Sequence, residues 1–545
     1  MPPLSILIWL PAACGLLGAL AGARNERLPG YAALAGAAGA LGLAIAYLVQ
    51  YGPGAHGLKD VTDVVWISTL GIHYKLGVSG LNVVLVAMTT LLFFAAILAS
   101  NLKAVPFERP RLFYFHMALA ESAVLGAFLA QDLALFVAFF DLMLIPFYFL
   151  IGTDWGPAAT PTRPVGPDRV KATIKLVIYT LVGSLLMLAA AIATGVLAAQ
   201  QSGGHVTFVL SQLQGLPLST GSQEWIFLFF AAAFLVKMPA FPLHGWMPDG
   251  YRAMPSEVLM VFSGVLSKVG AYGFLAIVLP LFPQAAAHFQ TLMLILALCS
   301  ILYGSAIAFT QTDARLIAGY SSVAQLGFIT LGVFALNPQG AQGALLQMVN
   351  HGLVVAPIFF IISLLAARAG GSTDVRDMGG IAFRAPALAA VFLIVALATL
   401  AMPGSANFVG EFLILLGVFK AKLAIAVIAF AGVVMASVYA LRLFIRAMHN
   451  RVGEKVTSRE LSPRDGLVLV PLVAVILLLA LYPQGALKRS EQSVAGSVNA
   501  AYLADFGLGT TPHGAHRHRS LAELFSGAAV AAHERPGAVE GGEGR

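Results

Sequence analysis

Apolar runs recur from one end of the sequence to the other, and this feature limits the possible folds most strongly. Each run has about 20 residues, which is enough for a helix to cross a hydrocarbon core of about 30 Å. Only 10% of the 545 residues are charged and 59% are hydrophobic, whereas soluble domains carry about 25% charged residues. The composition excludes a soluble fold and predicts an all-α polytopic membrane protein.

Polar breaks divide the apolar runs into about 14 predicted transmembrane helices. We place them near residues 4–23, 30–50, 78–100, 112–130, 132–151, 173–199, 224–245, 255–281, 288–310, 314–335, 341–367, 386–418, 424–448 and 465–485. The N-terminus lacks the basic flank and cleavage pattern of a secretory signal, so we expect the first run to remain as a span.

Lysine and arginine lie mostly on alternate loops between these runs. One set of loops holds Lys59, Lys75, Lys420 and Lys422, whereas the other holds Arg24, Arg27, Lys103, Arg109, Arg111, Arg163, Arg169, Lys171, Arg252, Arg315, Arg368, Arg376, Arg384, Arg446, Arg451, Lys455, Arg459 and Arg464. The positive-inside rule places the second set in the cytoplasm, and an even number of spans then puts both termini on the outer side of a bacterial inner membrane. This topology explains the net charge of +7, and no basic patch with interleaved aromatic residues indicates nucleic-acid binding.

Neither the two cysteines nor the C-terminal residues indicate a catalytic or binding site. Cys14 and Cys299 lie inside apolar runs without partner spacing, so we expect neither a disulfide nor a metal or iron–sulfur site, and no cofactor bound by this chain. The C-terminal residues 486–545 are expected to form a disordered tail, because the end of the chain is rich in Gly, Ala, His and Glu. Its histidine-rich part is expected to bind metal only incidentally.

Ionisable residues lie inside two of the apolar runs, and one of them stands beside prolines. Asp141 lies near the middle of one run, and Lys237 precedes Pro239 and Pro242 in another. An ionisable side chain at the bilayer centre costs about 2.5–3.5 kcal/mol, so each one needs a partner, a water-filled cavity or a function. Because proline removes a backbone donor and clashes with the carbonyl one turn earlier, we predict a broken helix beside Lys237.

A second broken helix is predicted near the other end of the chain, over Pro403–Glu411. Pro403 and Gly404 interrupt the apolar run, and Glu411 follows the interruption. Discontinuous helices that carry a buried charge are typical of transporter sites at the membrane midplane. The two breaks therefore indicate a pair of related half-sites.

Further ionisable residues lie in the spans between and before these breaks. Lys268 and His351 lie well inside their runs, whereas Glu121 is nearer to one end and His244 is close to an interface. A buried lysine changes its protonation with a nearby carboxylate, and a histidine can accept a proton while donating another, as a relay requires. The alternatives are a structural ion pair for the lysines and carboxylates, and an ordinary hydrogen-bonded core histidine for His351 and His244.

Four segments resemble the proton-translocating, antiporter-like subunits of respiratory complex I. They are Val236–Asp249, Leu266–Gly273, Gly319–Gly327 and Pro403–Phe412. The motif around Lys237 is shared by subunits L, M and N and by Mrp cation/proton antiporters. A glutamate at the Glu411 position is typical of the subunit M branch, since its relatives usually have lysine there.

The resemblance implies a fold and a proton path. The implied fold has about 14 helices and two inverted five-helix repeats, here divided as N-terminal helices 1–111, a first repeat 112–281, a second repeat 288–449, a last helix 450–485 and the tail. The implied proton path runs through Asp141, Lys237, Lys268, His351 and Glu411.

The sequence departs from the family at two positions of this path. The family commonly has glutamate where Asp141 stands, and the shorter aspartate is expected to lengthen any direct pair with Lys237 or to require a bridging water. The family commonly has histidine where Gln325 stands, and glutamine cannot titrate. We expect Gln325, with Glu121 and His244, to have at most an accessory role.

The resemblance also implies a reaction and a set of partners. It implies proton translocation driven by quinone reduction in other subunits, which would hold the NADH, FMN, iron–sulfur clusters and quinone. Expected partners are the antiporter-like subunits L and N, small membrane subunits and the lipid bilayer. The alternatives are an Mrp-type cation/proton antiporter subunit and an antiporter-like subunit of a membrane-bound hydrogenase.

Overall fold

The computed structural model describes residues 3–22, 25–103, 107–155, 167–457 and 459–506 of the chain. Among these residues, 12 helices are long and apolar enough to cross a membrane. This finding confirms the predicted all-α polytopic membrane protein. The count of about 14 spans, the two inverted repeats and the domain boundaries stay predictions.

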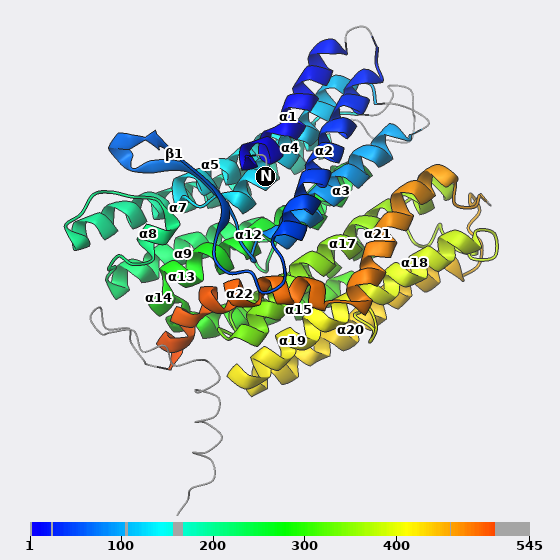
Figure 1. Cartoon of the computed structure of the whole chain (residues 1–545). Helices are drawn as coiled ribbons and strands as arrows, with labels where there is room; N and C mark the ends of the chain where they lie inside the picture. Colours follow the sequence, from blue (N-terminus) through cyan, green and yellow to red (C-terminus); the bar gives the residue numbers. More distant parts are fainter. Residues whose placement is uncertain (1–2, 23–24, 104–106, 156–166, 458, 507–545) are drawn as a thin grey trace, which may run out of the picture.

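The first four helices form one end of the molecule (Figure 1). They are α1 (Leu4–Ala21), α2 (Leu28–Gln50), α3 (Val83–Asn101) and α4 (Pro110–Leu129). Small residues allow α1 and α2 to approach closely, since a Cβ on Gly36 would lie 2.8 Å from the Cβ of Cys14. Such contacts between small residues are a usual basis of helix packing in membranes.

A β-hairpin joins α2 to α3, and the sequence analysis did not predict it. Strand β1 (Lys59–Ile67) pairs antiparallel with β2 (Ile72–Val78), with a 3₁₀ turn, η1 (Ser68–Leu70), between them. Asp132 fastens the hairpin to the helices, because its carboxylate accepts hydrogen bonds from the backbone N–H of His73 at 3.0 Å and of Leu135 at 3.1 Å. The second of these bonds caps the N-terminus of α5.

The next elements carry the first predicted break. They are α5 (Leu133–Leu142), α6 (Leu144–Gly152), α7 (Pro167–Ser202), α8 (Leu210–Leu213), α9 (Thr220–Lys237) and α10 (Met247–Ala253). Helix α9 ends on Lys237, as the following prolines predict. A further break, which was not predicted, separates α5 from α6 just after Asp141, where Pro146 cannot donate to the carbonyl of Leu142.

The centre of the molecule is built from long buried helices. One span combines α11 (Ser256–Val261), the π-helical η2 (Phe262–Leu266), α12 (Ser267–Gly273), the π-helical η3 (Phe274–Val278) and α13 (Leu279–Leu281). It is followed by α14 (Pro283–His288), α15 (Gln290–Thr310), α16 (Ala314–Val333) and α17 (Pro338–Arg368). In the apolar 18-residue stretch of each helix, 100% of the residues of α16 and 89% of those of α17 are buried, so these two helices form the core.

The last elements contain the second predicted break and one correction. They are α18 (Pro386–Thr399), α19 (Ala406–Ala421), α20 (Leu423–Met448), α21 (Pro463–Leu481) and α22 (Gln484–Asp505). The break between α18 and α19 confirms the prediction from Pro403 and Gly404. The predicted disordered tail is wrong over 486–505, which belong to α22, whereas 507–545 lie outside the described residues.

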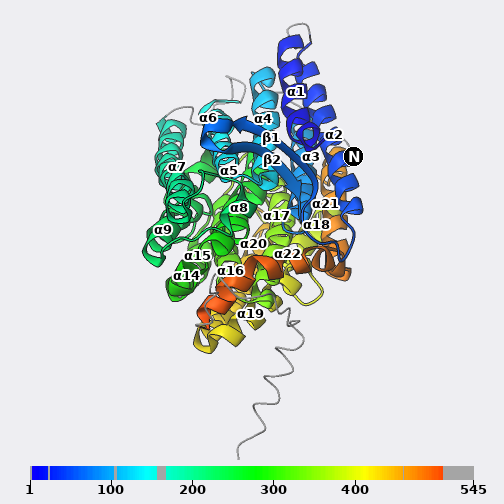
Figure 2. The ribbon, with the colours of Figure 1, turned by 60° about the vertical axis from the view of Figure 1, so that its left-hand side comes forward.

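Helix α22 was missed because only one of its faces is buried. Its buried residues recur at helical spacing: Ala486, Ser490, Val494, Ser497, Val498 and Ala501. It lies on the same side of the molecule as the hairpin (Figures 1 and 2). The N–H of Gly54 donates to the carbonyl of Lys488 at 3.1 Å, and the N–H of Gly80 donates to Oγ of Ser493 at 3.1 Å.

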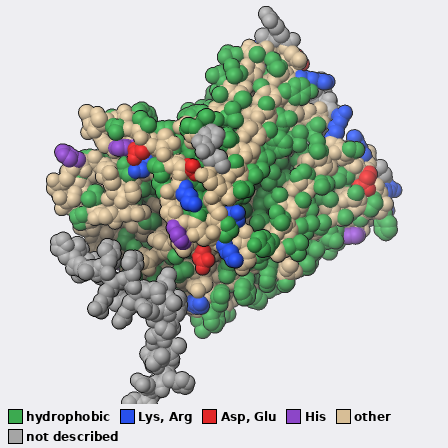
Figure 3. Space-filling view, in the orientation of Figure 1, with side chains coloured by type: hydrophobic (Ala, Val, Ile, Leu, Met, Phe, Trp, Pro, Cys, Tyr) green, Lys and Arg blue, Asp and Glu red, His purple; other side chains and the backbone are tan. Residues whose placement is uncertain are grey.

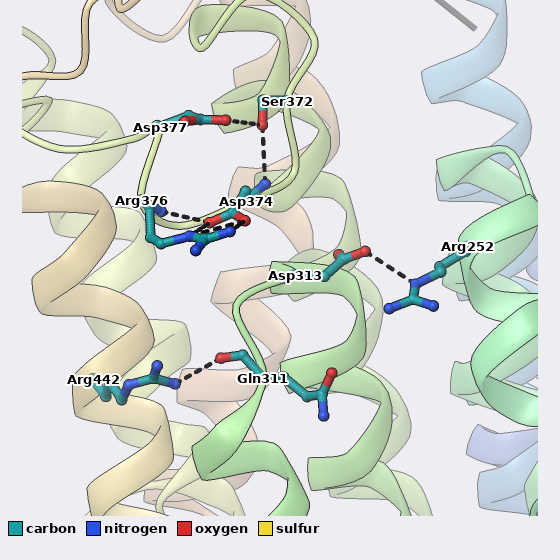
Figure 4. Close-up of polar contacts among 8 residues, drawn as sticks. All are labelled: Arg252, Gln311, Asp313, Ser372, Asp374, Arg376, Asp377 and Arg442. Carbon is teal, nitrogen blue, oxygen red and sulfur yellow. Dashed lines mark hydrogen bonds and ion pairs between the residues drawn. The ribbon is translucent and has the colours of Figure 1, made fainter. Parts of the chain in front are cut away.

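Arginine and aspartate join loops on the opposite side, at the ends of α10, α15 and α17 (Figure 4). Arg252 pairs with Asp313 at 3.5 Å, and Arg442 donates to the carbonyl of Gln311 at 2.8 Å. Asp313 also forms a β-bridge with Asp374. We call this side the arginine-rich side; it carries the loops that the sequence analysis assigns to the cytoplasm.

Candidate functional site

The five residues of the predicted path lie on five different helices. Asp141 is the penultimate residue of α5, and Lys237 is the last residue of α9. Lys268, His351 and Glu411 lie within α12, α17 and α19. Asp141 is half-buried, whereas the exposed fractions are 4% for Lys237, 0% for Lys268, 3% for His351 and 2% for Glu411. Each of the last four therefore carries its polar group inside the protein.

Asp141 and Lys237 are close enough for an electrostatic interaction but do not form a direct pair. Asp141 is the charged group that acts on Lys237, yet no ion pair within 4.0 Å joins them in the described part of the chain. The ammonium of Lys237 instead lies 4.4 Å from the ring centroid of Phe140. The arrangement agrees with the expectation that the short aspartate arm leaves a gap, which a water could bridge.

The chain that follows Lys237 is held in place after the helix breaks. The indole N–H of Trp246 donates to the carbonyl of Val236 at 3.0 Å, and the N–H of Phe241 donates to Oγ of Ser300 at 2.9 Å. Backbone groups released by the break thus have partners, which keeps the end of α9 rigid.

His244 lies in this segment, toward the arginine-rich side. Its ring is 5.0 Å from that of Tyr303 and 6.1 Å from that of Tyr320, measured between centroids. Its Nδ1 is buried and has no hydrogen-bond partner among the described residues. The structure thus places His244 beside the break at Lys237.

Lys268 is bound by oxygen atoms of its own span, and no carboxylate among the described residues pairs with it. Its ammonium donates to the carbonyl of Ser263 at 2.7 Å and to Oγ of Ser267 at 3.2 Å. Ser263 belongs to the π-helical η2, whose wider turn precedes Lys268. π-Helical segments inside α-helices are frequent at functional sites.

Glycines bring α17 close to Lys268. A Cβ on Gly352 would lie 2.6 Å from the carbonyl oxygen of Gly264, and a Cβ on Gly264 would lie 3.4 Å from the carbonyl oxygen of Gly352. His351 precedes Gly352, and Lys268 acts on it electrostatically. The close crossing of the two backbones therefore brings the span that carries Lys268 against the helix that carries His351.

His351 is not held by a hydrogen bond from the described residues. Neither ring nitrogen has a partner among them, although the side chain is only 3% exposed. This observation does not support the alternative of an ordinary hydrogen-bonded core histidine. Both nitrogens stay available for proton transfer.

Glu411 is surrounded by amides. Nε2 of Gln325 donates to Oε1 of Glu411 at 2.7 Å, and Nε2 of Gln347 donates to Oε1 of Gln325 at 2.8 Å. Oε2 of Glu411 has no partner within the described ranges. Gln325, expected to have only an accessory role, is thus the residue in closest polar contact with Glu411.

Sequence reasoning missed three buried polar residues in the part of the protein that contains His351 and Glu411. Gln347 and Asn407 are 0% exposed and Tyr439 is 1% exposed. Gln347 stands four residues before His351, and Asn407 stands four residues before Glu411, so each pair shares a helical face. Two polar residues four positions apart in an apolar helix are a signal by which Gln347 and Asn407 could have been found. No such polar neighbour indicates Tyr439.

Glu121 is fully buried but is not connected to the path by any described contact. It lies in α4, is 0% exposed, and neither carboxylate oxygen has a hydrogen-bond partner in the described segments. Both its functional and its structural interpretation stay open. Among the described residues, no group of three or more His, Cys, Asp or Glu side chains could hold a metal ion.

The chain is similar to known membrane proteins over most of its length. Residues 130–437 match the transmembrane family described as NADH:quinone oxidoreductase/Mrp antiporter. NADH-quinone oxidoreductase subunit M of Rhodobacter capsulatus is 34% identical over 92% of this chain and 98% of its own length.

Two solved structures share the fold. A chain of respiratory complex I from Thermus thermophilus is 30% identical, with a TM-score of 0.79 over 93% of this chain and 100% of that one. A chain of the Mrp complex from Dietzia has a TM-score of 0.77 over 93% of this chain and 100% of its own, but only 20% identity. The chain belongs to the subunit M family of NADH-quinone oxidoreductases, within the wider NADH:quinone oxidoreductase/Mrp antiporter family.

Proposed function

We propose that this chain is a proton-translocating membrane subunit of an NADH:quinone oxidoreductase, complex I, and that protons pass through Asp141, Lys237, Lys268, His351 and Glu411. One observation carries the proposal. Lys237, Lys268, His351 and Glu411 are at most 4% exposed, yet none of them forms an ion pair with any described residue. A structural role for buried charges normally requires such a pair, so a role in proton transfer explains them better.

The proposed proton path runs from Lys237 through Lys268 and His351 to Glu411. Quinone reduction in other subunits changes the electrostatic interaction between Asp141 and Lys237. Lys237 then passes its proton to Lys268, and the close crossing at Gly264 and Gly352 supports the next transfer to His351. His351 and Gln347 share a face of α17, which supports transfer onward to Glu411 and release on the outer side.

The proposed partners and location follow from the same assignment. The chain lies in a bacterial inner membrane beside the antiporter-like subunits L and N and small membrane subunits, with both termini on the outer side. The partner subunits hold NADH, FMN, the iron–sulfur clusters and quinone, and this chain binds none of them.

NADH-driven acidification of inverted membrane vesicles tests the proposal. Lys237→Ala is expected to abolish most acidification while the complex still assembles. Lys420→Ala is the matched control, because Lys420 is an exposed lysine at the end of α19 and lies outside the path. Wild-type acidification per NADH in Lys237→Ala would show that the central role of Lys237 is wrong.

The same vesicles distinguish the alternative of an Mrp-type antiporter, whose chain shares this fold. An antiporter predicts that Lys237→Ala leaves NADH oxidation and acidification unchanged but removes sodium-dependent proton exchange. A complex I subunit predicts loss of NADH-driven acidification and no sodium requirement.

A further inference from the structure

Two adjoining cavities open at the arginine-rich end of α3. One, of about 440 Å³, lies among α3, α11, α17 and α21, and the other, of about 280 Å³, lies among α2, α3 and α4. Leu102, Lys103 and Arg464 line both. A ligand that contacts Lys103 and Arg464 could therefore extend into either cavity.

The charges that line the cavities favour an anion. The acidic lining residues are Glu26, Glu257 and Asp465, and the basic ones are Arg27, Lys103, Arg368, Arg459 and Arg464. Two of the basic side chains already bind other groups of the cavity lining. Lys103 pairs with the buried Glu257 at 2.8 Å, and Arg368 donates to the carbonyls of Arg459, Leu364 and Glu460 at 2.7–3.0 Å.

Arg464, which lines both cavities, is a basic residue that is free to bind a ligand. It is exposed, and its guanidinium makes no hydrogen bond or ion pair with the residues that the structure describes. It stands in the first turn of α21, whose N-terminal N–H groups also favour an anion. A guanidinium binds a phosphate through paired hydrogen bonds.

Apolar helix faces lead away from the cavities along the membrane direction. On α3 the partly exposed residues recur every three or four positions: Val84, Ala87, Leu91, Phe94 and Leu98. This stripe is about 21 Å long at 1.5 Å per residue, which exceeds one leaflet of about 15 Å. On the neighbouring α21, Leu467, Val470 and Leu478 are 55%, 56% and 60% exposed.

Figure 3 shows the same arrangement on one face of the molecule. Hydrophobic side chains cover the surface between the N-terminal helices and the last helices, and Lys and Arg side chains lie along its upper right edge and also near its lower left end. Apolar surface that ends at basic side chains matches a phospholipid, whose charged head group sits at the membrane interface.

We propose that these cavities and the faces of α3 and α21 bind an anionic phospholipid, with its phosphate on Arg464, beside the Lys103–Glu257 pair, and its acyl chains along the two helices. The occupant is a lipid and not a helix of another subunit, because a helix about 10 Å wide does not fit a cavity of this size. The bound lipid joins the N-terminal helices to α21. This binding goes beyond proton translocation and does not depend on it.

Native mass spectrometry of the purified full-length chain tests the binding. The delipidated protein is mixed with phosphatidylglycerol, with phosphatidylcholine of the same acyl chains, or with inorganic phosphate. Phosphatidylglycerol is expected to remain bound, and Arg464→Gln is expected to weaken it about tenfold, the loss of about one charge-assisted hydrogen bond. Arg464→Lys keeps the charge and is expected to retain most of the binding.

Arg446→Gln is the matched control, since Arg446 is an exposed arginine on the same side but does not line the cavities. It is expected to bind phosphatidylglycerol like the wild type, and equal thermal unfolding of both variants shows that they fold. Equal binding of phosphatidylcholine, unchanged binding in Arg464→Gln, or displacement of the lipid by equimolar phosphate would each overturn the proposal.

Photocrosslinking locates the acyl chains in the assembled complex. Phosphatidylglycerol with a diazirine in its acyl chain is expected to label peptides of α3 and α21, and to label them less in Arg464→Gln. If the two helices stay unlabelled and crosslink to another subunit instead, that subunit covers the surface and the lipid site is wrong.

Discussion

Gln325 donates a hydrogen bond of 2.7 Å from Nε2 to Oε1 of Glu411, at the position where the resemblance to the complex I subunits implies a histidine. Gln347 holds the Gln325 amide in this orientation through a second bond of 2.8 Å. Glutamine can orient and stabilise the carboxylate but cannot carry a proton itself. In this chain, Gln325 is therefore placed to orient Glu411, and it cannot itself carry a proton along the proposed path.

Gln325→Met is expected to reduce NADH-driven acidification about tenfold or more. The change removes a hydrogen bond to a charged group, worth about 1.5–3 kcal/mol, and leaves Oε1 of Glu411 with a 3.5 Å contact to Gln347. Gln325→His keeps a hydrogen-bond donor beside Glu411, so it is expected to retain acidification. The measurement is the initial acidification rate per NADH oxidised in inverted vesicles.

The matched control is Gln284→Met, which changes an exposed glutamine at the start of α14. It is expected to leave acidification unchanged. A positioning role for Gln325 is wrong if Gln325→Met pumps like this control.

Asp141 gives a second prediction, because its carboxylate acts on Lys237 without touching it. Asp141→Asn removes the charge and is expected to lower acidification about tenfold or more, since a lost interaction of about 1.4 kcal/mol corresponds to a factor of ten. Asp141→Glu lengthens the arm by one methylene and is expected to pump at least as well as the wild type. Equal rates for Asp141→Asn and Asp141→Glu would contradict the proposed coupling to Lys237.

The two predicted helix breaks followed from local chemistry, whereas the contacts between distant residues did not. Proline removes a backbone donor wherever it stands, so the ends of α9 and α18 could be predicted near Lys237 and Pro403. The hairpin and α22 were missed, because an isolated hairpin or a half-polar helix gains its stability from the helices on which it packs.

The burial of Lys268 and Glu411 inside membrane helices could be predicted, but their polar partners could not. Buried charge is costly at any place in a membrane span, which identified Lys268 and Glu411 from their positions alone. The amides of Gln325 and Gln347 meet Glu411 only because α16, α17 and α19 pack together. Nothing in the local sequence around Tyr439 indicates that it belongs to the same region.

The hairpin is expected to loosen in acid, through Asp63. Lys75, at 2.9 Å, and His73, at 2.7 Å, hold the pKa of the Asp63 carboxyl below its usual value, with the hydrogen bond from Lys75 as the larger cause. Because the pKa of Asp63 is lower in the folded state, the ionised carboxylate stabilises the hairpin fully at pH values above the unfolded-state pKa of about 3.9. This stabilisation is lost as the pH falls through the folded-state pKa.

Hydrogen-exchange protection factors of the β1 and β2 amides measure this effect between pH 6 and pH 3. The expected loss is less than about 1 kcal/mol, because the Asp63 side chain is 36% exposed and screened by solvent. Asp63→Asn is the control and is expected to show lower protection at pH 6 with little further change in acid. Wild-type protection that stays constant below pH 4 would contradict a role for this carboxylate.

Gly343 gives the last prediction, because it lets α17 and α19 meet beside Glu411. A Cβ on Gly343 would lie 2.6 Å from the backbone nitrogen of Ile414 and 2.9 Å from the carbonyl oxygen of Gly410. Neither backbone atom can move without shifting α19. Gly343→Ala is therefore expected to cost about 1–3 kcal/mol of stability through overpacking and to lower acidification together with thermal stability.

Gly42→Ala separates this packing effect from the general effect of adding a methyl group to a helix. Nothing lies within 4 Å of the Cβ that it would add to α2, and alanine is favoured over glycine in a helix by about 1 kcal/mol. Thermal unfolding of the full-length chain in detergent is expected to show a lower midpoint for Gly343→Ala and an unchanged or higher one for Gly42→Ala. If both variants unfold like the wild type, α17 can move away from α19 freely, and the close crossing does not hold Glu411 in position.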